Sequence, residues 1–174
     1  GNAMQVNDKA DGILFLSLIS GRNAEMLIGK QVITAPILKQ SSLEVLPTGY
    51  ILIDSGKPTT VSYMSNTTPI PANKNTVAAC TAMAGEMLGL RLIFMDGGSG
   101  AKNPISEKMI KTVRNTIGPN RKIRLDTNMS WNIPQAKRLI NQWHEKYTID
   151  FFEAPVRIEP LSQMKELKAS TQAS

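Results

Sequence analysis

Short apolar runs alternate with longer amphipathic stretches along this chain of 174 residues. The apolar runs, most of them bounded by glycine, proline or polar residues, predict strands over Gly12–Leu18, Leu43–Pro47, Arg91–Asp96, Lys122–Asp126 and Ile149–Glu153. The amphipathic stretches predict helices over Ala24–Gln40, Asn75–Leu88, Ser106–Ile117, Pro134–Tyr147 and Pro160–Lys168. An additional strand pair, Tyr50–Asp54 with Thr59–Met64, is suggested by the turn-forming Ser-Gly-Lys-Pro between them.

This alternation of strands and helices predicts the fold class. Buried strands that alternate with helices are typical of a parallel sheet with helices packed outside it. The length is that of one ordinary domain, so we expect a single α/β domain over residues 1–174. A parallel sheet also brings the carboxyl ends of its strands to one edge, where ligands of such folds bind.

Composition and charge narrow the functional classes. An apolar fraction of 41% and a charged fraction of 20% are globular values. The net charge of +6 is spread along the chain, its tightest basic group being Arg121, Lys122 and Arg124, and only 5% of residues are aromatic. A nucleic-acid partner is therefore not expected, whereas an anionic small molecule fits the balance.

The cysteine content and the hydropathy of the chain suggest the cellular compartment of the protein. Cys80 is the single cysteine and is predicted to be a buried small hydrophobe, so an internal disulfide is excluded. We expect a cytoplasmic protein without a transmembrane segment, because the apolar runs are far shorter than the roughly 20 residues that a membrane helix needs. The first residues lack the pattern of a signal peptide.

The glycine-rich loop after the third predicted strand is the first candidate site. In the sequence MDGGSGAKNPIS, Asp96 ends the strand and is followed by Gly97, Gly98, Ser99 and Gly100. Glycines allow close backbone approach, and a helix that begins near Pro104–Ser106 would add its positive end, so the loop suits a phosphate. The alternative is an ordinary strand-to-helix turn.

Two further acids end the next two strands. Asp126 and Glu153 would lie at neighbouring strand ends, and two carboxylates with waters and substrate oxygens are a reasonable ligand set for Mg²⁺. The alternative is a pair of solvated acids, one of them capping the following helix.

Long segments of residues 1–117 resemble geranylgeranylglyceryl phosphate synthase. They are ADGILFLSLISGRNAEMLIGKQV, LEVLPTGYILIDSGKPTTVSYMSNTTPIPANK and LGLRLIFMDGGSGAKNPIS. The resemblance implies a TIM-barrel prenyltransferase that joins a polyprenyl diphosphate to glycerol 1-phosphate with Mg²⁺. It also implies that Asp96 holds the glycerol hydroxyls and that Tyr50 lies on the substrate side. Within the substrate-binding loop Gly97–Gly100, it implies that the backbone of Ser99 and Gly100 holds the phosphate. Residues 1–5 resemble the segment after the family's third strand.

Residues 120–172 resemble a different barrel family, the enolase superfamily. KIRLDTNMSWNIPQAKRLI and IDFFEAPVRIEPLSQMKEL are similar to its third and fourth strands with their helices. This resemblance places Asp126 and Glu153 on the first two Mg²⁺-ligand positions of that family. No counterpart of its third acidic ligand or of its catalytic bases is present. The two resemblances meet at Gly118–Asn120, so we expect a chimera of barrel fragments, residues 1–118 and 119–174.

The chain lacks several segments of the synthase family, and their absence changes the activity that we expect. The family's first three strands, with their Mg²⁺ and diphosphate ligands, and its two later phosphate loops have no counterpart. The resemblance therefore implies a prenyltransferase of impaired or absent activity. Alternatives are a non-catalytic chimeric scaffold and Mg²⁺-dependent proton abstraction of the enolase type. Because a closed TIM barrel has eight strands, we expect a partial barrel, an oligomer-completed barrel or an open doubly wound sheet, most simply as a homo-oligomer.

Overall fold

The fold is a five-stranded, fully parallel sheet whose strands follow one another in chain order, β1-β2-β3-β4-β5. The structure is a computed structural model and describes residues 6–7, 9–157 and 159–171, so the expectation for residues 1–5 lies outside the described residues. The elements are β1 (Gly12–Leu18), η2 (Glu25–Gly29, a π-helical turn), α1 (Lys30–Gln40), β2 (Glu44–Leu52), α2 (Thr60–Met64), α3 (Asn75–Met87), β3 (Leu92–Asp96), α4 (Glu107–Ile117), β4 (Lys122–Asp126), α5 (Ile133–Tyr147), β5 (Ile149–Glu153) and α6 (Leu161–Ser170).

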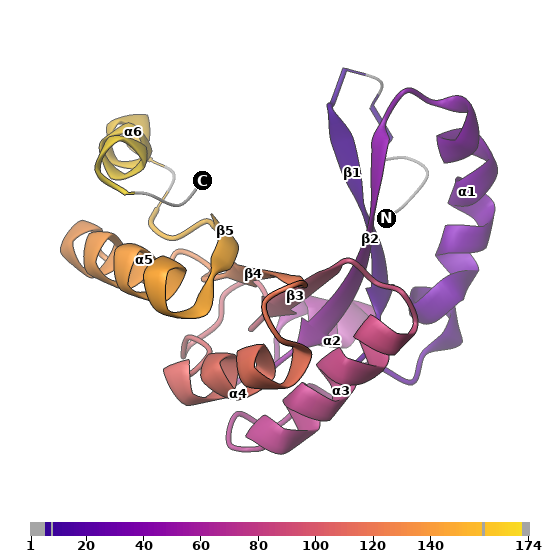
Figure 1. Cartoon of the computed structure of the whole chain (residues 1–174), viewed down its shortest axis with the longest axis horizontal. Coiled ribbons are helices and arrows are strands. Elements are labelled where there is room, and N and C mark those ends of the chain that lie inside the picture. The colour runs from indigo at the N-terminus through magenta and orange to yellow at the C-terminus, as the bar shows by residue number, and fades with distance from the viewer. Residues whose placement is uncertain (1–5, 8, 158, 172–174) are drawn as a thin grey trace.

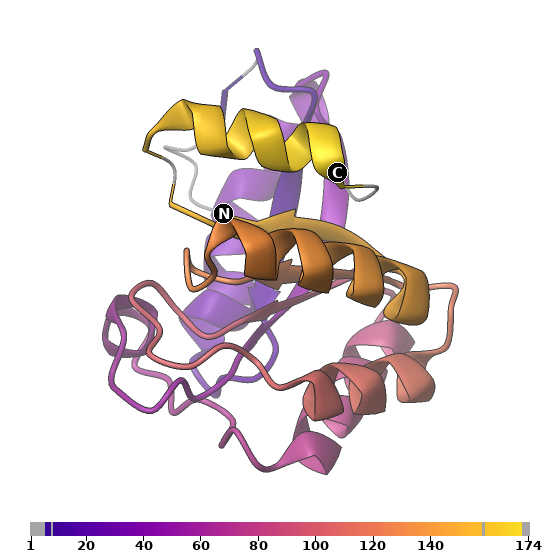
Figure 2. The ribbon, with the colours of Figure 1, turned by 90° about the vertical axis from the view of Figure 1, so that its left-hand side faces the viewer.

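The sheet is curved but open. In Figure 1 the strands bend from the upright β1 and β2 to β5, and α1, α3, α4 and α5 lie along the outer side of the curve. Figure 2 shows α6, in yellow, stacked beyond α5 at the β5 end of the sheet. The expected parallel α/β fold of partial-barrel type is thus confirmed, with β1 and β5 as its two edge strands.

The core lies between the sheet and the outer helices. All five residues of β3 are buried, as expected for its central strand. In β4, Ile123 and Leu125 are buried against the helices, whereas Arg124 and Asp126 are only partly buried on the opposite face. This alternation departs from the expected fully buried runs, because the inner face of an open sheet stays partly solvated.

One predicted strand pair is wrong. Residues 44–52 form the single strand β2, so Leu43–Pro47 and the first part of Tyr50–Asp54 belong together. Residues Thr60–Met64 are instead the short helix α2, because Thr59 and Ser62 form a reciprocal capping box at its start. The chain after β2 makes its isolated parallel bridge between Ile53 and Ile70.

Helix α5 forms where the sequence predicts it, because its capping residues and its apolar periodicity agree. Asn132 and Gln135 form a capping box, and Pro134 lies in the first turn. Ala136, Ile140 and Trp143 are buried on one face, as the helical periodicity predicts.

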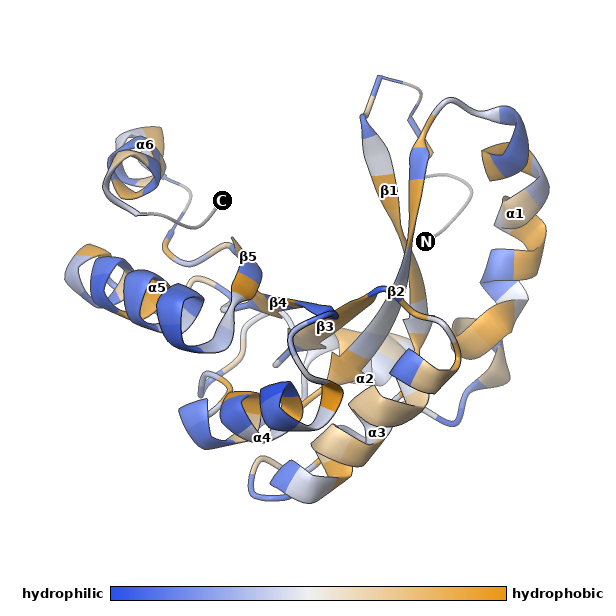
Figure 3. Cartoon of the chain, in the orientation of Figure 1, coloured by the Kyte–Doolittle hydropathy of each residue, from blue (hydrophilic) through white to orange (hydrophobic). Residues whose placement is uncertain are grey.

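Helix α1 and the π-helical turn η2 before it leave much of their apolar surface uncovered. Ile28 is 58%, Val32 63%, Ile33 66% and Ile37 47% exposed, and hydrophobic positions recur along α1 in Figure 3. Cys80 on α3 is also exposed, contrary to its predicted burial, and Ala78, Ala79, Ala82 and Gly85 are the buried residues of that helix. Within the described residues, no helix is long and apolar enough to cross a membrane.

Candidate functional site

The strand-end acids form one row at the carboxyl edge of the sheet. The parallel register places Leu52 beside Asp96, Asp96 beside Asp126 and Asp126 beside Glu153. Three carboxylates therefore occupy the corresponding positions of three adjacent strands. The structure brings together residues from both halves of the chain, as the reading of the strand ends anticipated.

Asp96, in the middle of the polar contacts of this row, accepts three hydrogen bonds. It is only 6% exposed; its Oδ1 accepts from the Gly98 backbone N–H at 2.6 Å and from Asn128 Nδ2 at 2.7 Å, and its Oδ2 accepts from the Tyr50 hydroxyl. A carboxylate has about four acceptor positions, so roughly one remains for a ligand hydroxyl.

Tyr50 is a neutral hydrogen-bond donor to Asp96. Burial, followed by the negative charge of Asp96, raises the pKa of Tyr50 far above its usual range. Its ring stacks on Phe94 with centroids 5.6 Å apart, which fixes the direction of the hydroxyl. The predicted substrate-side tyrosine therefore orients Asp96 in the structure described.

Asn128 is the third donor to Asp96, and the sequence did not lead us to predict this hydrogen bond. Asn128 and Met129 follow β4 with φ of 51° and 57°, in the left-handed region. Asparagine tolerates this conformation better than most residues, and here it directs the amide at Asp96. The signal was present in Asp-Thr-Asn after a strand, a pattern that supports a local side-chain turn; Asn128 N–H indeed donates to Asp126 Oδ1 at 2.8 Å.

The other two acids are destabilised as anions. Burial, with contributions from Asp96 and Glu153, raises the pKa of Asp126 to about 7. Burial and Asp96 likewise raise the pKa of Glu153, which Arg124 partly offsets. At neutral pH the row therefore holds fewer than three negative charges, and a cation or a proton stabilises it.

The glycine loop is more closely packed against its own chain than the sequence suggested. Gly98 has φ of +85°, and a Cβ there would lie 2.5 Å from Thr59 Oγ1 and 2.9 Å from Val61 Cγ1. Its missing side chain thus makes room for α2 rather than for a ligand. Ser99 and Gly100 are exposed, so these two residues offer the accessible part of the loop.

The expected contribution of the following helix is also reduced. Helix α4 begins at Glu107, and Ser106 Oγ accepts from the Met109 backbone N–H at 3.3 Å. The cap and the acid in the first turn occupy the helix end that an anion would need. Asn103, between the loop and α4, donates to the Ser55 carbonyl through its backbone and side chain.

Lys57 supplies the positive charge that the sequence reading overlooked. It lies in the loop after β2, and its Nζ is 3.9 Å from the position of a Cβ on Gly100. The order of a parallel sheet could have revealed it, because the loops after β2 and β3 leave neighbouring strand ends.

Whether the strand-end row can bind Mg²⁺ depends on which of its three carboxylates are available as ligands. Asp96 is already occupied by three internal donors, which leaves Asp126 and Glu153 as the carboxylates with the raised pKa that a cation would relieve. Two carboxylates suffice for Mg²⁺ when substrate oxygens and waters complete its shell. Among the described residues, however, no group of three or more His, Cys, Asp or Glu side chains is arranged to hold a metal ion.

A curved parallel sheet with outer helices, whose strand-end acids lie in one row, has the architecture of the β/α-barrel class with an open sheet. Comparison with known families gives two matches: the PcrB family over residues 1–120 and the enolase C-terminal domain-like family over residues 79–174. The chain therefore belongs to the PcrB family in its N-terminal two thirds and to the enolase C-terminal domain-like family in its C-terminal part.

Curated relatives support the first match. Geranylgeranylglyceryl phosphate synthase of Chitinophaga pinensis is 60% identical over 117 residues, which cover 67% of this chain and 46% of that protein. The enzyme of the same name from Methanothermobacter marburgensis is 41% identical over 114 residues, covering 66% of this chain and 46% of that protein. The chain thus spans about half the length of the curated relatives it matches.

Solved structures reflect both matches. Geranylgeranylglyceryl phosphate synthase of Thermoplasma acidophilum, in complex with sn-glycerol-1-phosphate, superposes with a TM-score of 0.79 at 23% identity, over 96% of this chain and 64% of that chain. A dipeptide epimerase of Enterococcus faecalis, complexed with Mg and a dipeptide, superposes with a TM-score of 0.50 at 25% identity, over 59% of this chain and 28% of that chain. The suspected combination of two barrel families is consistent with these matches.

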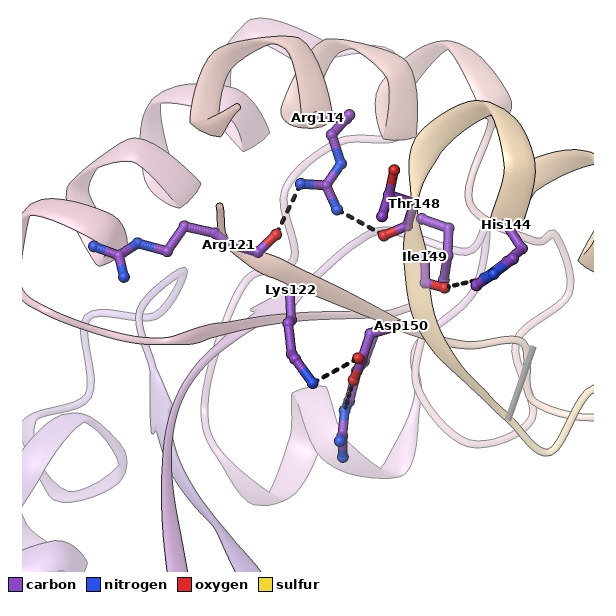
Figure 4. A network of polar contacts seen from close by, with 8 residues as sticks. Arg114, Arg121, Lys122, His144, Thr148, Ile149 and Asp150 are labelled. Atoms are coloured by element: carbon purple, nitrogen blue, oxygen red, sulfur yellow. Dashed lines mark hydrogen bonds and ion pairs between the residues drawn. The ribbon is translucent and has the colours of Figure 1, made fainter. Parts of the chain in front are cut away.

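A buried arginine joins the two parts of the chain. Arg114 on α4 is 8% exposed, and its four hydrogen bonds end on backbone carbonyls. It donates to Gly118 and Arg121 at the junction and to Tyr147 and Thr148 at the end of α5, at 2.6 to 2.9 Å. Figure 4 shows the guanidinium between the junction and the α5–β5 turn, with the Lys122–Asp150 ion pair nearby. The junction is therefore integrated by specific contacts.

Proposed function

We propose that the strand-end row and the adjoining glycine loop bind glycerol 1-phosphate, with the chain acting as a prenyltransferase of the geranylgeranylglyceryl phosphate synthase type and reduced activity. The observation that carries this proposal is the environment of Asp96. A buried carboxylate held by Tyr50, Gly98 and Asn128 keeps about one acceptor position for a hydroxyl. The support from relatives is their name and the ligand of the Thermoplasma acidophilum enzyme.

The phosphate would lie on the accessible side of the loop. Ser99 and Gly100 are exposed, and Lys57 is the side-chain cation beside Gly100. Ser55, next to Gly97, has a buried hydroxyl without a hydrogen-bond partner among the described residues. These donors suit an anion, whereas the carboxylate of Asp96 repels bare phosphate and favours an ester that carries hydroxyls.

Reduced activity follows from the C-terminal part of the chain. After Gly118 the sequence follows the enolase-like match, and the later phosphate loops of the synthase resemblance are replaced by β4, β5 and their helices. The prenyl diphosphate thereby loses donors that its leaving group needs, since developing charge on diphosphate must be stabilised. We expect transfer to be slow. In this step the glycerol hydroxyl oxygen bonds to the prenyl carbon, the bond from that carbon to the diphosphate oxygen breaks, and the hydroxyl proton passes to solvent.

Mg²⁺ has a specific place in this proposal. Asp126 and Glu153 would hold it, and it would supply positive charge beside the phosphate oxygens. The same two acids support a second candidate function, Mg²⁺-dependent proton abstraction of the enolase type. That candidate rests on the adjacent register of Asp126 and Glu153 and on the Mg bound to the Enterococcus faecalis epimerase.

Calorimetric titration with glycerol 1-phosphate and with inorganic phosphate tests the binding claim. The parent chain should prefer the ester, and Asp96→Asn should lose that preference by about tenfold, because the amide disrupts the hydroxyl acceptor. Lys57→Gln should weaken both ligands, whereas Lys74→Gln, in an exposed turn before α3, serves as the charge-matched control. Equal affinity of the parent for both ligands, or no binding at all, would contradict the proposal and favour a non-catalytic scaffold.

Transfer is tested separately with geranylgeranyl diphosphate and glycerol 1-phosphate in the presence of Mg²⁺. We expect slow formation of the ether product that stops in Asp96→Asn. Binding of the ester without any product would leave glycerol-phosphate recognition standing and reject the transferase activity.

A further inference from the structure

A cavity of about 340 Å³ lies at the β5 end of the sheet, away from the strand-end row. Its lining is predominantly apolar, and the apolar part consists of Ile140, Phe151, Phe152, Pro155, Met164 and Leu167. It is an open cavity formed by three consecutive elements, α5, β5 and α6, and by the segments next to them. Figure 2 shows α6 extending beyond α5 at this end of the molecule. The volume falls at the lower end of the roughly 300–1,000 Å³ typical of small-molecule sites.

The cavity lies beside β5, which is an edge strand of the sheet in the described residues. In the described residues no strand pairs with the outer edge of β5, so α6 spans a space that a neighbouring strand fills in a closed barrel. Phe151 lies on the inner face of β5, where Arg124 stacks on its ring at 5.4 Å from the centroid. Phe152 and Leu167, by contrast, are buried with the helices. The cavity thus connects the core side of the sheet with its open edge.

Two lysines give this apolar cavity a positive rim. Lys165 and Lys168 are also among its lining residues, three positions apart on one face of α6. Both are exposed, and neither forms an ion pair in the described part of the chain, whereas Glu166 on the same helix pairs with Lys137 at 2.7 Å. An apolar chamber beside two unpaired cations is complementary to a molecule with an apolar chain and one anionic end.

We propose that this cavity binds an anionic amphiphile, an aliphatic chain of medium length that ends in a carboxylate or phosphate. The chain would occupy the space between Phe152, Met164 and Leu167, and the anionic head would lie beside Lys165 and Lys168. This site is separate from the glycerol-phosphate site and does not depend on it. Apolar burial supplies most of the affinity, and the lysines select the sign of the head group.

The test uses decanoate as the probe, with decyltrimethylammonium and decanol as head-group controls, all below the concentrations at which they aggregate. Methyl-¹³C-methionine labelling makes Met164 a reporter inside the cavity, while buried Met95 and Met109 report on the distant core. Decanoate should shift the Met164 methyl signal in a saturable manner. It should bind about five- to tenfold more tightly than the cationic probe, and Lys165→Gln with Lys168→Gln should remove that preference.

A filling substitution distinguishes the cavity from general surface binding. Met164→Trp should abolish decanoate binding, measured by calorimetry, because the larger side chain occupies the cavity. Leu161→Trp is the matched control, since Leu161 lies on the same helix, is 64% exposed and is absent from the lining; it should bind as the parent does. The proposal is overturned if decanoate leaves the Met164 signal unmoved, if the cationic probe binds equally well, or if Met164→Trp binds decanoate as the control does.

Discussion

At the scale of single residues, Arg114 has the largest structural role outside the candidate site. A guanidinium has five N–H donors in a fixed fork. Three hydrogen bonds from Arg114 reach the carbonyls of Gly118, Tyr147 and Thr148 at the ends of α4 and α5, and the fourth reaches the Arg121 carbonyl in the turn before β4. Burial lowers the pKa of Arg114, yet arginine stays charged in proteins. The side chain of Arg114 therefore connects the end of α4 to the end of α5 by hydrogen bonds.

Arg114→Met should lower the free energy of unfolding by about 3 kcal/mol or more, because it leaves several buried carbonyls unsatisfied. Arg121→Met provides the comparison, since Arg121 forms a half-exposed ion pair with Glu86 at 3.3 Å and should cost less than about 1 kcal/mol. Urea unfolding at one fixed protein concentration measures both. Similar costs for the two variants would show that Arg114 does not integrate the junction.

Asp126 makes stability depend on pH. Its pKa in the folded chain is raised from 3.8 to about 7, so the folded state binds the proton more tightly than the unfolded state does. The associated stability is fully present below about pH 4 and is lost as pH rises through about 7. Because the side chain is only partly buried, solvent screening limits the effect to about 1–2 kcal/mol.

The measurement is urea unfolding of parent and Asp126→Asn between about pH 5 and pH 8.5. The parent should lose stability relative to the variant as pH rises, since the amide cannot ionise. Parallel pH curves for the two proteins would mean that Asp126 ionises freely in the folded state.

At the scale of elements, the sequence identified regular structure well wherever local signals agreed. The predicted bounds of β1, β4 and β5 match the structure, and α5 has its expected cap and buried face. The failure occurred at residues 59–64, where the turn-forming Ser-Gly-Lys-Pro before them suggested the second strand of a pair, but Thr59 and Ser62 cap a helix. The capping box there decides the local structure.

The candidate site was predicted less completely than the fold. The acids Asp96, Asp126 and Glu153 could be placed in one row because parallel strands share a carboxyl edge. The inward amide of Asn128 depends on a left-handed backbone, and the proximity of Lys57 to Gly100 depends on how two loops pack. The Asp-Thr-Asn sequence indicates a local turn and the strand order brings the two loops near each other, but the contacts of Asn128 and Lys57 also depend on tertiary packing, which residue types do not specify.

The loop–helix contact at Gly98 gives a prediction at this scale. Gly98→Ala should destabilise the fold by about 2–3 kcal/mol, because it combines a positive φ with a Cβ that meets Thr59 at 2.5 Å. Gly89→Ala isolates the backbone part, since Gly89 has φ of +85° with nothing within 4 Å of a Cβ; about 1 kcal/mol is expected. Thermal unfolding of both variants compares them, and equal losses would show that Gly98 does not pack closely on α2.

At the scale of the whole molecule, the open sheet and the uncovered side of α1 favour self-association. Edge strands and an exposed apolar stripe of Ile28, Val32, Ile33 and Ile37 are unfavourable in water. We expect a homo-oligomer, most simply a twofold dimer. Sedimentation should show a species heavier than the 19.1 kDa monomer at micromolar concentration.

Ile33→Lys should shift that equilibrium toward the monomer by placing a charge in the stripe, whereas Gln40→Lys at the exposed end of α1 adds the same charge outside it. A monomer at every concentration, or equal behaviour of both variants, would mean that this helix face is not an interface.

The most direct test of the central claim, that the strand-end row binds a hydroxyl-bearing phosphate ester, is a pH-dependent titration of glycerol 1-phosphate in the absence of Mg²⁺. Between about pH 8.5 and pH 7 a phosphate ester keeps most of its charge, because its second pKa is about 6, whereas Asp126 takes up a proton. The parent should bind the ester severalfold more tightly at the lower pH, and Asp126→Asn should show a flat profile at the higher affinity. An affinity of the parent that does not change with pH, or a variant that follows the same slope as the parent, would contradict binding at this row of carboxylates.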